Sequence, residues 1–191
     1  TLMTLLESLI ATQAHQVLVI CVLDAPRDAS SVHQRKNHTT VDALHAAYRA
    51  RSTLGKPPHW TEFELPTGSL LLLEHWHPPW SLPPKAGVGL ARKLGCDLAV
   101  ALNVQGTLHA SWIHCTDADA QLPTDYFSRL KKMPSDIAAV CYPFTHDSEA
   151  ALRYEASLRY FVLGLAHAGS PYAHHTVGST FALSMAHYTQ V

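Results

Sequence analysis

The sequence has no excess of either charge. Its 191 residues include 14 Lys and Arg against 15 Asp and Glu, so the formal net charge is −1. A balanced chain has no broad basic surface to attract a polyanion, and we therefore expect no nucleic acid partner. Charged residues make up 15% of the chain and hydrophobic residues 47%. This composition and length predict a globular protein with a sizeable core.

Long apolar runs and paired cysteines are also lacking. No stretch approaches the roughly 18 apolar residues that indicate a membrane span, and no basic region with a small-residue cleavage site marks a signal peptide. The cysteines are Cys21, Cys96, Cys115 and Cys141, and none forms a C-x-x-C pair. Without such spacing a zinc module is not expected. We therefore expect a cytoplasmic chain with reduced, buried thiols and no membrane span.

Two kinds of apolar pattern alternate along the chain. Continuous apolar runs predict strands at 17–23, 69–76, 112–116 and 137–142. Helical spacing predicts helices at 2–10, 40–52, 85–102 (interrupted at Gly95) and 148–166, a short helix after Thr124, and a loop at 55–66. Strands that alternate with helices are typical of α/β proteins, and strands that are apolar throughout are typical of parallel sheets. The sequence predicts a single α/β domain over residues 1–191, a three-layer α/β/α sandwich with a mostly parallel sheet.

Segment 112–120 is the most informative, because two aspartates follow a strand-like apolar run. Asp117 and Asp119 are two residues apart, and such residues point the same way in an extended segment. The carboxyl ends of strands in open α/β sheets border a ligand-binding crevice. Carboxylate oxygens suit Mg²⁺ or Mn²⁺, which commonly take phosphate oxygens as further ligands. The pattern predicts a metal–diphosphate site; an acidic turn without a ligand is the alternative.

Four segments in this order resemble the nucleotide-sugar glycosyltransferases of the large family-2 type. They are L-L-E-S-L-I at 5–10, the run at 17–23 with D-A-P at 24–26, K-A-G-V-G-L-A-R at 85–92, and D-A-D-A at 117–120. The last resembles the family's D-x-D signature. The resemblance implies the GT-A (nucleotide-diphospho-sugar transferase) fold. It also implies an enzyme that moves a sugar from a nucleotide-diphosphate donor to an acceptor, which could be a saccharide, a lipid or a small molecule.

The resemblance assigns roles to three aspartates. Asp119 would be the principal ligand of Mn²⁺ or Mg²⁺. Asp117 would assist through the metal, a water molecule or the sugar–ribose end of the donor. Asp24 would accept a hydrogen bond from the nucleobase or ribose, although it could equally be a turn residue before Pro26.

Two further regions carry expected contacts. Lys85 and Arg92 would bind the nucleotide or diphosphate, since they lie seven residues apart on one predicted helix; a solvated helix face is the alternative. The segment V-G-S-T-F-A at 177–182 resembles the family's acceptor side, where Gly178 and Ser179 would lie.

The chain departs from the family pattern at both ends. Family members begin with a strand that precedes the first helix, and inverting members carry their catalytic base after an aromatic, glycine-rich turn. We therefore expect residues 1–191 to be a core fragment that lacks the first strand, with the base beyond Val191.

Two other functions remain open. A truncated or degenerate domain could bind nucleotide or a partner without turnover. The segment D-A-D-A-Q-L at 117–122 also resembles the D-x-D-G-T-L motif of haloacid-dehalogenase-like phosphatases. In that family the motif follows the first strand, whereas at least two predicted strands precede it here.

Overall fold

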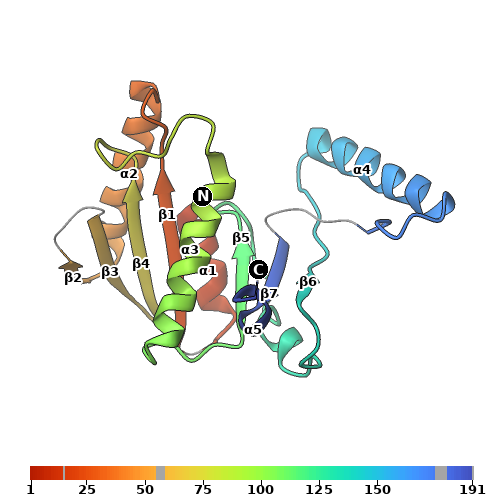
Figure 1. Ribbon diagram of the computed structural model, residues 1–191. Helices are drawn as coiled ribbons and strands as arrows, with labels where there is room; N and C mark the ends of the chain where they lie inside the picture. Colours follow the sequence, from red (N-terminus) through yellow and green to blue (C-terminus); the bar gives the residue numbers. More distant parts are fainter. Residues whose placement is uncertain (15, 55–58, 175–179, 191) are drawn as a thin grey trace. The chain divides into compact units, whose positions relative to one another are not determined.

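The computed structural model describes residues 1–14, 16–54, 59–174 and 180–190. These residues form both helices and sheets, which confirms the mixed α/β class (Figure 1). They divide into two compact units, each described below by itself. The first unit comprises Thr1–His109 and Ala118–Met133, and the second comprises Ala110–Asp117 and Pro134–Val191. The interpretation as a single domain stays a prediction.

The first unit is built on a four-stranded sheet. Its strands are β1 (Val17–Asp24), β2 (Ala50–Leu54), β3 (His59–Leu65) and β4 (Gly68–His75). They lie in the order β1-β4-β3-β2. Strands β1 and β4 are parallel, with Asp24 opposite His75, whereas β3 is antiparallel to both of its neighbours. Only Pro66 and Thr67 join β3 to β4, and so short a connection produces an antiparallel pair.

Helices cover both faces of this sheet. They are α1 (Leu2–Ala11), α2 (Ser31–Ala47) and α3 (Gly87–Val104) (Figure 1). Leu6 of α1 and Leu44 of α2 are fully buried in the core, against which Cys21 of β1 also packs. On the other face α3 approaches β1 so closely that a Cβ added at Gly95 would lie 3.6 Å from Cγ2 of Val22. Adjacent residues of a strand face opposite ways, so β1 lies between α1 and α2 on one side and α3 on the other.

The second unit contains a smaller, antiparallel sheet. Its elements are β5 (Trp112–Thr116), β6 (Ala139–Cys141), α4 (Glu149–His167), β7 (Thr180–Ser184) and α5 (Met185–Tyr188). The strand order is β5-β7-β6, and both pairs are antiparallel. Among the described strands only β1 and β4 pair in parallel, so these small, mixed sheets do not match the expected mostly parallel sheet. A continuous apolar run indicates that a strand is buried on both faces, but it does not indicate the direction in which the strand pairs.

Several predicted elements are confirmed, and others need correction. All four predicted strands are present, and so are the first and the last of the predicted helices, α1 and α4. Helix α2 begins at Ser31 instead of residue 40, and residues 50–54 form β2 instead of ending that helix. Within the expected loop at 55–66, residues 59–65 form β3, and residues 55–58 lie outside the described part. Helix α3 continues through Gly95 without a break, and only a three-residue turn (η1, Ser128–Leu130) follows Thr124.

None of the helices in the described part of the chain is both long and apolar enough to cross a membrane. The four cysteines are free thiols. Cys96 and Cys115 are buried as expected, Cys21 is half-buried, and Cys141 is exposed at the end of β6. The prediction of buried thiols is therefore wrong for Cys141.

Candidate functional site

A cavity of about 660 Å³ lies in the first unit beside the carboxyl half of β1. Its volume falls in the range of small-molecule sites. The walls come from β1, the first helix, α2 and the segment after β5. The lining residues are Thr1, Leu2, Cys21, Val22, Leu23, Asp24, Val32, Arg35, Lys36, Asn37, Thr39, Thr40 and Ala118. All of them belong to the first unit.

Asp24 lies where β1 ends and the cavity wall begins. The side-chain amide of Asn37 donates a hydrogen bond to the backbone carbonyl of Asp24 at 3.2 Å, which ties α2 to the end of the strand. Burial raises the pKa of the Asp24 carboxyl, although a hydrogen bond from its own backbone and the nearby His75 act in the opposite direction. A carboxyl group that is partly desolvated at a cavity wall is suited to a directed hydrogen bond with a ligand. The structure thus places this predicted residue in the cavity.

Arg35 and Lys36 add positive charge to the cavity wall. Both are exposed residues of α2, and an arginine beside a lysine is suited to binding phosphate oxygens. The neighbouring Thr39 and Thr40 hydroxyl groups donate to the backbone carbonyls of Arg35 and Lys36, each at 3.0 Å. The sequence pattern predicts neither basic residue, because it predicts that the helix that carries them starts at residue 40.

Cys21 lines the same cavity but is not suited to nucleophilic chemistry. Burial, and to a smaller extent the charge of Asp24, raises the pKa of the Cys21 thiol to about 12. The reactive form of cysteine is the thiolate, so the protonated Cys21 acts here as a small apolar wall residue.

The D-A-D segment belongs to the cavity through Ala118, which lines it. Both flanking aspartates are exposed. Asp119 lies in the first unit and Asp117 in the second, so the pairing of their carboxylates stays a prediction. Among the described residues, no three His, Cys, Asp or Glu side chains are placed to hold a metal together. Two carboxylates still fit Mg²⁺ or Mn²⁺, because such ions usually complete their coordination with water and substrate phosphates.

Lys85 and Arg92 do not lie on one helix as predicted. Helix α3 begins at Gly87, and Lys85 precedes it with a left-handed backbone (φ 67°). Its neighbour Ala86 donates its backbone N–H to the carbonyl of Pro83 at 3.1 Å, so the chain turns here before the helix starts. Neither cation is among the residues that line the described cavity. Their predicted contact with a diphosphate therefore has no support from the geometry of the first unit.

The predicted acceptor residues Gly178 and Ser179 lie outside the described residues. In the second unit, the Tyr142 hydroxyl is 2.9 Å from Nδ1 of His114 on β5. Burial lowers the pKa of His114 to about 4, so its ring is neutral at physiological pH. A neutral, hydrogen-bonded histidine in a sheet is a packing residue of this unit.

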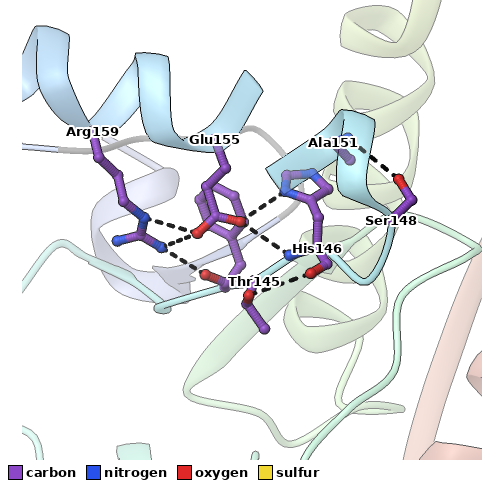
Figure 2. A network of polar contacts seen from close by, with 7 residues as sticks. Thr145, His146, Ser148, Ala151, Glu155 and Arg159 are labelled. Carbon is purple, nitrogen blue, oxygen red and sulfur yellow. Dashed lines mark hydrogen bonds and ion pairs between the residues drawn. The ribbon is translucent and has the colours of Figure 1, made fainter. Parts of the chain in front are cut away.

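A second polar cluster joins α4 to the loop before it (Figure 2). The buried carboxylate of Glu155 accepts hydrogen bonds from the backbone N–H and Nδ1 of His146, at 3.0 and 2.9 Å. It also accepts one from Nε of Arg159 at 2.8 Å, and Arg159 in turn donates to the carbonyl of Phe144 at 2.8 Å. These bonds hold the pKa of Glu155 at about 2. The cluster fixes the loop against α4, a structural role that the sequence pattern does not predict.

Comparisons with family models, with curated proteins and with solved structures gave no match for this chain.

Proposed function

We propose that this chain is the donor-binding part of a glycosyltransferase that uses a nucleotide-diphosphate sugar. The observation that supports this most is the cavity at the carboxyl end of β1. It combines Asp24 with the cations Arg35 and Lys36, and it includes Ala118 from the centre of D-A-D. A nucleotide diphosphate needs a hydrogen-bonding partner for its base or ribose and positive charge for its phosphates, and these residue types supply both.

Divalent metal is part of the proposal. Asp119, with Asp117 assisting, would hold Mn²⁺ or Mg²⁺ beside the diphosphate. The bound ion would stabilise the negative charge that develops on the leaving nucleoside diphosphate. Arg35 and Lys36 would share that charge from α2, while Asp24 orients the nucleoside end.

The finer fold assignment also belongs to this proposal. Helices on both faces of the four-stranded sheet are compatible with a three-layer α/β/α sandwich of the GT-A type. The parallel pair β1–β4, with Asp24 at its carboxyl end, matches the place where such folds bind nucleotides. A phosphatase of the haloacid-dehalogenase type is less well supported, because four described strands precede β5, the strand that the aspartates follow.

A thermal-shift panel tests the proposal. UDP-, GDP- and other nucleotide sugars would each be added with and without Mn²⁺ to the unmodified chain, to Asp119→Ala and to Asp24→Asn. A ligand at about 100 times its dissociation constant adds roughly 2.7 kcal/mol of stability, which a melting curve detects easily. We expect one donor class to raise the melting temperature in the presence of Mn²⁺. Both substitutions should reduce the shift, and Asp136→Ala, at an exposed residue that does not line the cavity, should not.

The same panel separates the alternatives when release of nucleoside diphosphate is assayed on the same samples. A metal-dependent shift without release of nucleoside diphosphate would favour the domain that binds nucleotide without turnover. A shift that is equal in Asp119→Ala and in the unmodified chain would contradict the metal site.

A further inference from the structure

Helix α4 is apolar on more than one side. Glu155 is buried and Leu158 half-buried, so this is the covered side of the helix. A second set of large apolar side chains is exposed: Leu152 at 43%, Tyr160 at 80% and Leu163 at 66%. A helix that carries apolar residues on several sides is normally buried on each of them. The second side of α4 therefore has the character of an interface.

This exposed stripe is complementary to itself when the helix is turned end for end. Its members are spaced by three or four residues and so share one face of the helix. In chain order they are Glu149, Leu152, Ala156, Tyr160, Leu163 and His167. On an antiparallel copy, the small Ala156 comes opposite the large Tyr160, and Leu152 comes opposite Leu163.

The polar ends of the stripe follow the same symmetry. Glu149 lies in the first turn of α4, where its carboxylate pairs with Arg153 at 2.6 Å, and His167 lies in the last turn. In an antiparallel pair each carboxylate comes opposite the partner copy's imidazole, at both ends of the contact. Antiparallel helices also bring the positive end of one helix dipole beside the negative end of the other.

We propose that the exposed stripe of α4 is a homodimer interface, in which α4 packs antiparallel on α4 of a second copy around a twofold axis that passes between Ala156 and Tyr160. An isologous contact of this kind requires a self-complementary patch, and the order of residues in the stripe satisfies that requirement. We infer that the partner is a second copy of this chain, because each residue of the stripe comes opposite a complementary residue of the same stripe. A 19-residue helix is about 28 Å long. One helix pair is smaller than a standard interface of roughly 1,200–2,000 Å², so the dimer is reversible.

Sedimentation velocity over a wide range of concentrations tests the contact. We expect the unmodified chain to shift from monomer to dimer as its concentration rises, and Tyr160→Glu to remain monomeric. The matched control is Tyr154→Glu, at an exposed tyrosine (62%) on another side of α4, which should dimerise like the unmodified chain. Circular dichroism confirms that both variants keep their helices. A chain that stays monomeric throughout, or equal loss of dimer in both variants, would overturn the proposal.

A charge exchange tests the antiparallel arrangement. Glu149→Lys alone should weaken the dimer, because His167 of the second copy then loses its carboxylate acceptor. Adding His167→Glu should restore the dimer, since a lysine and a carboxylate then face each other at both ends. If the double variant is no stronger than the single one, the antiparallel twofold pairing is wrong.

Discussion

Asn37 of α2 donates its side-chain amide to the backbone carbonyl of Asp24, at the carboxyl end of β1. The two residues are 13 positions apart, and both line the cavity of the first unit. The bond joins the helix that carries Arg35 and Lys36 to the strand that carries Asp24. It thereby fixes the relative positions of the anion-binding and base-binding ends of the proposed donor site.

Removing this bond should loosen the cavity. Asn37→Ala leaves the carbonyl of Asp24 without its side-chain donor, and a hydrogen bond of this kind contributes about 1 kcal/mol. We expect that loss in the free energy of unfolding measured with denaturant, together with weaker nucleotide binding. Gln34→Ala on the exposed side of the same helix is the control and should change stability by less than about 0.5 kcal/mol. Equal losses in the two variants would refute the role of Asn37.

Asp24 should lower stability at neutral pH. Because burial raises its pKa above the ordinary 3.8, the folded state holds this proton more tightly than the unfolded state. Stability is therefore lost as the pH rises from about 3.8 through the raised pKa. Asp24→Asn removes this loss, so its melting temperature should exceed that of the unmodified chain at pH 7 and match it near pH 3. The exposed Asp28→Asn is the control, and a lower melting temperature for Asp24→Asn at pH 7 would contradict the account.

Glu155 should have the opposite pH dependence. Hydrogen bonds from His146 and then Arg159 lower its pKa from 4.5 to about 2. Their contribution is complete above pH 4.5 and is lost as the pH falls towards 2. Glu155→Gln should speed hydrogen exchange in residues 144–155 at pH 7, and the difference from the unmodified chain should shrink in acid. Asp97→Asn, which removes an exposed pairing with Lys93, should leave that segment unchanged. Equal exchange in Glu155→Gln and the unmodified chain at pH 7 would show that the cluster does not hold the loop.

Gly68 should not tolerate a side chain. Its φ is 146°, and an added Cβ would lie 2.1 Å from the carbonyl oxygen of Val17, its neighbour at the start of β1. Backbone atoms cannot move aside as a flexible side chain would, so Gly68→Ala should cost about 3 kcal/mol or more. Gly106→Ala, also at a positive φ but in open space, should cost clearly less. Denaturant unfolding of both variants measures the difference, and a small effect at Gly68 would contradict the close approach of β1 and β4.

The helices and strands that could be predicted are those in which burial produces a regular pattern of apolar residues in the sequence. The apolar run at 17–23 and the leucine stripe of α1 identify these elements, because the core excludes polar residues there. The first turns of α2 carry exposed polar side chains, so no apolar pattern shows where this helix begins. Strand β3 was missed although Thr61, Phe63 and Leu65 are buried and alternate with glutamates. That period of two was visible in the sequence, but the neighbouring Pro57 and Pro58 favoured a loop.

The candidate site was predictable only in part. Asp24 could be found because it ends an apolar strand, which local sequence reveals. Arg35 and Lys36 reach the cavity through the packing of α2 beside β1, and no local pattern records that contact. Glu155 and Arg159 were a visible pair at a spacing of four residues, but the third member, His146, joins them through a turn that spacing does not reveal.

Direct binding of Mn²⁺ is the measurement that tests the central proposal most closely. The free Mn²⁺ signal would be followed by electron paramagnetic resonance as the chain is titrated in with UDP or GDP present. We predict that the free signal falls with one of these nucleotides for the unmodified chain and for Asp136→Ala, and that Asp119→Ala abolishes the fall. If the signal is unchanged with every nucleotide, or if Asp119→Ala binds Mn²⁺ as well as the unmodified chain, the proposed metal–diphosphate site is contradicted.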